Sequence, residues 1–184
     1  DNGGDTITAR GVVWEQYPNP VVTGMRTTDG SGTGTFVSTL NGLSPVTVYY
    51  VRAYATNSAG TAYGEQLTFE SEPGLPLVTT DTLSNITDNS ANGGGTVILD
   101  GGSNVTARGV VYGTQAQPEI DADMFTVDGS GTGPFSSSMT GLLPGTLYYM
   151  RTYATNAVGT AYGEELSFYT PAILPTVTTL SPYT

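Results

Sequence analysis

The sequence predicts an all-β protein built from tandem β-sandwich domains, and three observations carry this prediction. Turn-forming residues are abundant, with 25 Gly and 11 Pro beside 12 Tyr, which is typical of many short strands joined by tight turns. The segment 141–156 begins with a Pro-Gly turn and continues as an alternating aromatic strand. A close copy stands at 42–57, about 99 residues earlier, and this distance is the size of one β-sandwich domain.

The second copy of the repeat contains a full set of expected strands. Turn signals separate them, among them Asp100-Gly101-Gly102 and Pro144-Gly145. The expected strands lie near residues 76–86, 92–99, 105–113, 124–127, 133–139, 146–156 and 160–169. This number and spacing of short strands match one complete sandwich domain.

The first copy is expected to be incomplete. Gly3-Gly4 matches Gly101-Gly102, so the chain enters this copy after the place of its second strand. Near the other end, residues 173–181 resemble residues 74–84, which hold the first strand of the second copy. We therefore expect three parts. These are a domain without its first strands at 1–71, a complete domain at 72–170, and a linker with one strand at 171–184. The linkers are short and contain Pro, which favours semi-rigid connections.

Alternation along the strand 146–156 defines two faces. We expect Tyr148, Met150, Thr152 and Ala154 to face the core, because the other face carries Arg151. On the strand 105–113 we expect Arg108 and Tyr112 to point outward beside Arg151, with Val111 inward.

The composition excludes several classes of function. The net charge is −11, and the basic residues are five Arg, whereas nucleic-acid binding needs a basic surface. Neither His nor Cys occurs, so Ser-His-Asp and Cys-His catalysis and ordinary zinc ligation are excluded. Glu164 and Glu165 would point to opposite faces of a strand and form no acid–base pair. We expect a non-enzymatic protein with no nucleic-acid partner and no membrane span in this segment, since no stretch approaches the roughly 20 apolar residues required.

The repeated segment resembles a known family. The motif Leu-x-Pro-Gly-Thr-x-Tyr at 142–148, followed by alternating residues to Asn156, is similar to the second half of a fibronectin type III domain. The first copy keeps the motif at 43–49, with Val46 in place of the glycine. More narrowly, residues 105–112 resemble the fibronectin-like repeats of surface and secreted proteins of Bacteroidetes-type bacteria. The tryptophan that animal members carry in the second strand is missing from residues 90–101.

The resemblance implies structural roles and a location. Tyr49 and Tyr148 take the place of the tyrosine corner, whose phenol bonds back to the backbone at a turn. The resemblance also implies an exported protein with a mechanical or adhesive role at the cell surface. Its partners would be neighbouring copies of the same domain or protein, and a cell-surface glycan or protein.

Two loops of sequence Asp-Gly-Ser-Gly-Thr-Gly are candidate calcium sites, with Asp29 and Asp128 as the carboxylates. Calcium prefers six to eight oxygen ligands with several carboxylates, and each loop offers one. The alternative is a plain inter-strand loop in which glycines adopt positive φ. No other cofactor is indicated.

A Tyr-Arg-Tyr pattern is the candidate interaction face. Aromatic and Arg side chains are favoured at interfaces and stack on sugars. The alternative is cross-strand packing of Arg over Tyr rings, which the presence of the pattern in both copies favours. The residues are Tyr50, Arg52 and Tyr54 in the first copy, and Tyr149, Arg151 and Tyr153 in the second.

Two Asp-Thr-aliphatic triplets resemble the short acceptor of bacterial O-glycosylation, with Thr6 and Thr82 as the acceptors. The alternative is a chance match in a Thr-rich protein.

The sequence is compatible with three functions. The main hypothesis is a piece of an extracellular array that forms a stalk, fibre or adhesin shaft. The second is a pilus-like subunit that donates its last segment to a neighbour by strand addition. The third is a carbohydrate-binding accessory module of a secreted protein. The candidate donor residues are Ile173, Leu174, Val177 and Leu180.

Overall fold

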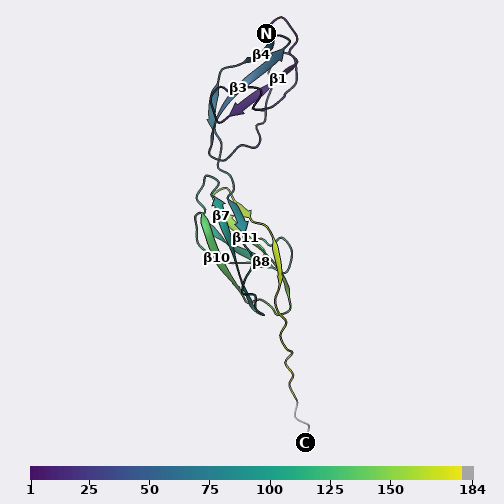
Figure 1. Ribbon diagram of the computed structural model, residues 1–184, viewed down its shortest axis with the longest axis vertical. Coiled ribbons are helices and arrows are strands. Elements are labelled where there is room, and N and C mark those ends of the chain that lie inside the picture. The colour runs from purple at the N-terminus through teal and green to yellow at the C-terminus, as the bar shows by residue number, and fades with distance from the viewer. Residues whose placement is uncertain (180–184) are drawn as a thin grey trace. The chain divides into compact units, whose positions relative to one another are not determined.

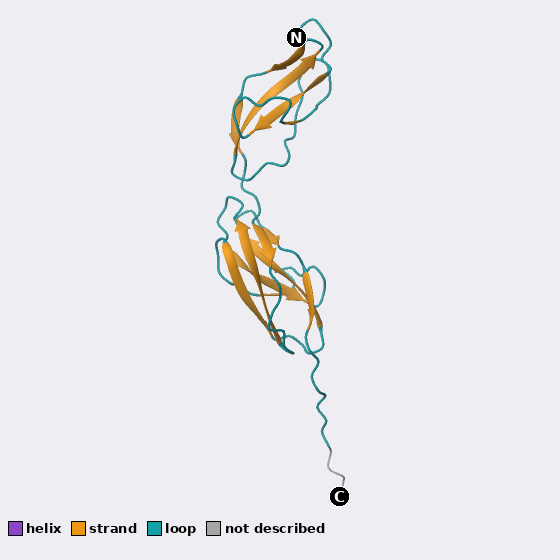
Figure 2. Ribbon diagram, in the orientation of Figure 1, coloured by secondary structure: helices purple, strands orange, loops and turns teal. Residues whose placement is uncertain are grey.

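A computed structural model describes residues 1–179 of the chain. Within this range the fold is all-β, as the sequence predicts: thirteen strands occur and no helix (Figure 2). No segment of the described residues forms a helix that would be long and apolar enough to cross a membrane. The chain divides into two compact units, which we call unit 1, Asp1–Pro73, and unit 2, which begins at Gly74 (Figure 1).

Unit 2 is a sandwich of two antiparallel sheets. One sheet has the order β10-β7-β6, and β10 and β7 lie side by side in Figure 1. The other has the order β12-β11-β8-β9, with β13 also paired to β11. The strands are β6 (Leu77–Thr80), β7 (Ser90–Leu99), β8 (Ala107–Gly113), β9 (Met124–Phe125), β10 (Gly133–Thr140), β11 (Leu147–Thr155), β12 (Thr160–Tyr162) and β13 (Leu166–Tyr169).

The inward face of β11 is the one that the sequence predicts. Tyr148, Met150, Thr152 and Ala154 are each at most 2% exposed. The prediction for β8 is wrong, because Val110 and Tyr112 pack in the core cluster around Met150. Val111 is the cross-strand partner of Arg151 and therefore shares the outer face with it. A one-residue error in the phase of a strand inverts all its side chains.

Glycines in β7 bring the two sheets together closely. A Cβ atom on Gly93 would lie 2.7 Å from the terminal methyl of Met150, and one on Gly95 would lie 2.6 Å from the Cγ2 methyl of Thr152, and both of these residues are in β11 of the other sheet. Two fully buried methionines, Met139 and Met150, fill the core beside this glycine run. Their flexible side chains fill irregular spaces, which explains how a second strand without tryptophan still faces a packed core.

Unit 1 consists of one five-stranded sheet with the order β2-β1-β3-β4, in which β5 also pairs with β3. Its strands are β1 (Ala9–Glu15), β2 (Met25–Arg26), β3 (Val48–Asn57), β4 (Gly60–Tyr63) and β5 (Leu67–Glu70). Residues 34–41 match β10 in sequence but form no strand here. Ile7, Val13, Trp14, Tyr49 and Tyr54 are its buried hydrophobic residues.

Residues 171–179 form no strand in the described structure. The donor candidates Ile173, Leu174 and Val177 are 60%, 90% and 84% exposed. The fourth candidate, Leu180, lies outside the described residues.

Candidate interaction site

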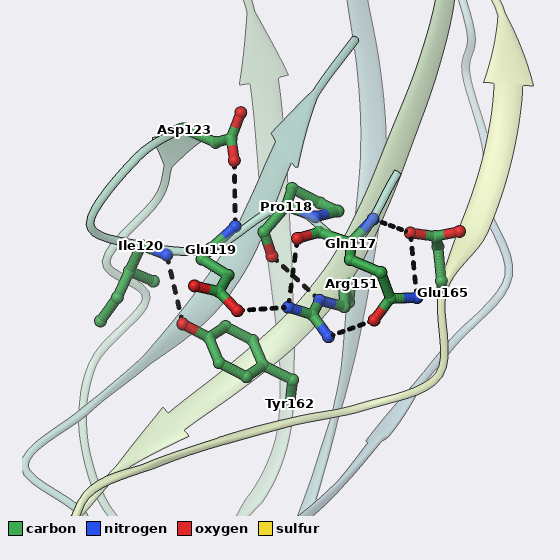
Figure 3. A network of polar contacts seen from close by, with 8 residues as sticks. All are labelled: Gln117, Pro118, Glu119, Ile120, Asp123, Arg151, Tyr162 and Glu165. Atoms are coloured by element: carbon green, nitrogen blue, oxygen red, sulfur yellow. Dashed lines mark hydrogen bonds and ion pairs between the residues drawn. The ribbon is translucent and has the colours of Figure 1, made fainter. Parts of the chain in front are cut away.

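The outer face of β11 is organised around Arg151. Its guanidinium carbon lies 4.1 Å from the centre of the Tyr162 ring, which is close enough for a cation–π interaction. Its Nε donates to the Pro118 carbonyl at 2.9 Å, and its Nη1 donates to the Gln117 side-chain oxygen at 3.0 Å (Figure 3). Glu119 adds an ion pair at 3.8 Å. Arg151 is therefore held between the sheet and the loop that follows β8.

The same loop is attached to the sheet by further bonds. The Gln117 N–H donates to the Glu165 carboxylate, and the Ile120 N–H donates to the Tyr162 hydroxyl at 3.2 Å (Figure 3). Gln117 has φ 59°, a left-handed conformation that a non-glycine residue adopts at some cost. These contacts leave Arg151 only 9% exposed and Pro118 fully buried.

Tyr153 is covered in the same way. Its hydroxyl donates to the Thr126 carbonyl at 2.6 Å, and the Phe125 ring packs against it edge-on at 6.1 Å. Burial raises the pKa of Tyr153, and the nearby Asp128 carboxylate raises it further. The side chain is 1% exposed.

The expectation of an exposed Tyr149-Arg151-Tyr153 face is thus corrected. Arg151 lies under the loop that follows β8, Tyr153 lies against Phe125 of β9, and of the three residues only Tyr149 is partly exposed. The face points away from the core, as alternation requires, but outward does not mean exposed when a loop covers it. The sequence analysis did not identify the covering residues. They had a signal in the sequence, because Pro118 and Tyr162 of the second copy match Pro20 and Tyr63 of the first.

Unit 1 repeats this arrangement with fewer bonds. The Arg52 guanidinium lies 4.5 Å from the Tyr63 ring centre, and its Nε donates to the Gly64 carbonyl at 3.2 Å. Tyr54 is 5% exposed and donates to the Thr27 carbonyl at 2.8 Å. Arg52 and Tyr50 are half-buried. The expectation of exposure is therefore corrected for Tyr54 as well.

The tyrosine residues at the turn before β3 and β11 bond back to the backbone. The Ser44 N–H donates to the Tyr49 hydroxyl at 2.9 Å, and the Leu143 N–H donates to the Tyr148 hydroxyl at 3.0 Å. The Ser44 N–H also holds the pKa of Tyr49 below its usual value. Both rings are 2% exposed and stack on a phenylalanine of the neighbouring strand. This geometry makes them structural groups.

The two candidate calcium carboxylates are engaged by hydroxyl groups of their own units. Asp29 accepts from Thr27 at 2.6 Å and from Ser38 at 2.5 Å, and these bonds lower its pKa. Asp128 accepts from Thr126 at 2.6 Å and from Ser137. Among residues 1–179 no group of three or more acidic side chains is placed to hold a metal ion. The hydroxyl partners had a signal in the sequence, because Thr-x-Asp with Ser nine residues later occurs in both copies.

Thr6 and Thr82, the candidate acceptors for O-glycosylation, are both exposed. The Thr6 N–H donates to the Asp5 carboxylate at 2.7 Å, so the acidic and hydroxyl residues of that triplet lie together.

Comparisons with known proteins find structural likeness alone. No family model and no curated protein matches the chain. A sensor domain of the anti-sigma factor RsgI4 from Pseudobacteroides cellulosolvens is 20% identical, over 54% of this chain and 98% of its own, with TM-score 0.41. Chicken CNTN1 FN1–FN3 is 16% identical, over 89% of this chain and 56% of its own, with TM-score 0.40. A fourth FNIII domain from human is 20% identical, over 59% of this chain and 88% of its own, with TM-score 0.43.

Proposed function

We propose that the chain is a non-enzymatic extracellular structural repeat that forms part of a stalk, fibre or adhesin shaft at a bacterial cell surface. One observation carries this proposal: what the two units share is structural. The shared groups are the corner tyrosines, the arginine over a tyrosine ring, and the aspartate with its two hydroxyl donors. Each of these groups is bonded within its own unit, which supports a structural role.

Further support comes from the linkers, which also repeat. The Ser71 hydroxyl, at the end of unit 1, accepts a hydrogen bond from the Thr47 N–H at 3.0 Å. The Thr170 hydroxyl accepts the matching bond from the Thr146 N–H at 3.0 Å. Each hydroxyl also donates to a carbonyl of the turn before β3 or β11. The last residue of each repeat is thus fastened to its own unit, which suits a chain that carries tension from one unit to the next.

Single-molecule stretching tests the mechanical role. We expect unit 2 to unfold in one step that lengthens the chain by roughly 300 Å, since an extended residue spans at most about 3.6 Å. It should refold when the force is released. Gradual extension without a discrete step contradicts the proposal.

A glycan-binding screen tests the carbohydrate-binding alternative. Because Arg151 and Tyr153 are covered, these side chains should not contribute to glycan binding. We therefore expect that no glycan binds the intact chain but fails to bind an Arg52→Ala, Arg151→Ala double variant. Such a glycan would overturn the proposed function. Export is tested separately, by whether a protease added to intact cells removes the protein.

A further inference from the structure

The chain enters unit 2 at Gly74, and the side chain of Asn156 holds it there. The Asn156 Nδ2 donates to the Gly74 carbonyl at 2.7 Å and to the Asp100 carbonyl at 2.8 Å. Its Oδ1 accepts from the Val158 N–H at 2.9 Å and from the Gly159 N–H at 3.2 Å. A side-chain amide has two donor hydrogens and two acceptor sites. Asn156 uses all of them, and it is only 5% exposed.

Two glycines let the entering chain lie close against unit 2. The Gly74 N–H donates to the Gly101 carbonyl at 2.8 Å. A Cβ atom on Gly101 would lie 2.3 Å from the Gly74 carbonyl oxygen and 2.6 Å from that of Leu75. A Cβ atom on Gly159 would lie 3.1 Å from the Cδ2 methyl of Leu75. Gly74 is thus bonded through both its N–H and its carbonyl, and we call its bonds to Asn156 and Gly101 the entry contact.

The strand that follows the entry contact is short and irregular. β6 has four residues, and its pairing with β7 shifts register between Leu77 and Val78. Such an irregularity locally disrupts the bonds between two strands. Tension that arrives along the chain from the side of unit 1 reaches Gly74 before it reaches β6. The entry contact therefore protects β6 from being peeled away from β7.

We propose that Asn156 is the residue through which tension enters unit 2, and that its bond to Gly74 sets the force at which β6 separates from β7. This inference rests on the proposed mechanical role and names the residue on which that role depends at the start of the unit. Asn156 directly follows β11 of one sheet, and Asp100, which it also holds, directly follows β7 of the other. Force on Gly74 is therefore passed to both sheets and does not act on β6 alone.

Stretching unit 2 from two different starting points tests the inference. The chain contains no cysteine, so an introduced pair provides unique handles. Handles at Glu72→Cys and Ile173→Cys apply the force through Gly74. Handles at Ile86→Cys and Ile173→Cys apply it after β6, so that it bypasses the entry contact. All three handle positions are exposed in the unchanged chain.

Asn156→Asp is the main test variant. It keeps an acceptor oxygen for Val158 and Gly159 but replaces the donor to Gly74 by a carboxylate oxygen. We expect the rate of unfolding at constant force to rise at least about tenfold when the force enters through Gly74, the factor that about 1.4 kcal/mol of barrier gives. With the handle at Ile86 the rate should change far less. Asn156→Ala removes the donor without adding a charge, and it should give the same difference between the two pairs of handles.

The discrete lengthening step shows for each molecule that unit 2 was folded before it was stretched. Equal increases in rate for both pairs of handles would overturn the inference, because Asn156 would then act only on the overall stability of unit 2. An unchanged rate with the force entering through Gly74 would overturn it as well. Both results leave the proposed mechanical role standing, because that role requires only that the unchanged unit 2 unfolds in one step and refolds.

Discussion

Units 1 and 2 carry the same motifs in different surroundings. In unit 2, residues Gly133–Thr140 form β10 because they pair along their whole length with β7. In unit 1, the matching residues 34–41 form no strand, and Val37 is 91% exposed. Both segments share a Gly-x-Phe-x-Ser pattern. This segment is therefore a strand where a neighbouring strand satisfies its backbone groups.

The two units also differ in how far a shared face is buried. Met150 and Val51 occupy the same place on β11 and β3, but Met150 is fully buried and Val51 is half-buried. Leu67 is 67% exposed, whereas its counterpart Leu166 is partly buried against the core. Groups that bond within one sheet and its own turns, such as the corner tyrosines, are alike in both units. One sheet therefore suffices for the local bonds, and the second sheet is needed for the core.

The largest expected difference lies in the core. We expect Met150→Ala to destabilise unit 2 by about 2–5 kcal/mol, because it leaves a cavity in a closed core. Val51→Ala should destabilise unit 1 by about 1 kcal/mol, since the side chain is already partly in water. Equilibrium unfolding in urea measures both.

The two units can be followed separately in that experiment. The chain has one tryptophan, Trp14 in β1, so its fluorescence reports on unit 1, while far-ultraviolet circular dichroism reports on both units. Equal losses of stability for the two substitutions would contradict the difference in burial.

A smaller difference is expected for the two arginines. Arg151→Ala should cost unit 2 about 1.5–3 kcal/mol, the range for hydrogen bonds to a charged group. Arg52→Ala should cost unit 1 about 0.5–1 kcal/mol, because its main contact is a half-exposed cation–π pair. Arg151→Lys serves as the control: it keeps the charge but loses the planar guanidinium, so it should recover only part of the loss. Full recovery by lysine would show that the charge matters and the bonding geometry does not.

The corner tyrosines should show no difference between the units. Tyr49→Phe and Tyr148→Phe each remove one hydroxyl that accepts a backbone N–H, at nearly equal distances. We expect each to cost about 0.5–1.5 kcal/mol, the usual net value of a hydrogen bond. Thermal unfolding, read for each unit as above, measures the pair. A much larger loss in unit 2 would mean that the corner depends on the second sheet.

Much of the fold could be predicted from the sequence, because turn chemistry and alternation are local signals. Every range predicted for unit 2 contains a strand, and the predicted inner face of β11 is confirmed, but the range 76–86 holds only the short β6 and the range 160–169 divides into β12 and β13. The exposure of the outer face was not predicted correctly, because its cover comes from Gln117 and Pro118, more than thirty residues from Arg151. The phase of β8 failed for a related reason. All of Val110, Val111 and Tyr112 are buried, so alternation left no polar side to mark the outside.

The smallest expected effect is the contribution of Asp29 to the pH dependence of the stability of unit 1. The hydroxyls of Ser38 and Thr27 lower the pKa of Asp29 from 3.8, so the folded state holds this proton less tightly than the unfolded state. The stabilisation is therefore complete above pH 3.8 and is lost as the pH falls through the lower folded-state value. We expect the melting temperature of unit 1, followed by Trp14 fluorescence, to fall less steeply on acidification in Asp29→Asn than in the unchanged chain.

Ser38→Ala removes the larger of the two hydroxyl contributions and should flatten the same slope. Asp5 also has a lowered pKa, from bonds to Ser58 and Thr6, so part of the acid sensitivity should remain in both variants. Parallel curves for all three proteins would mean that Asp29 is bonded to these hydroxyls without gaining from its charge.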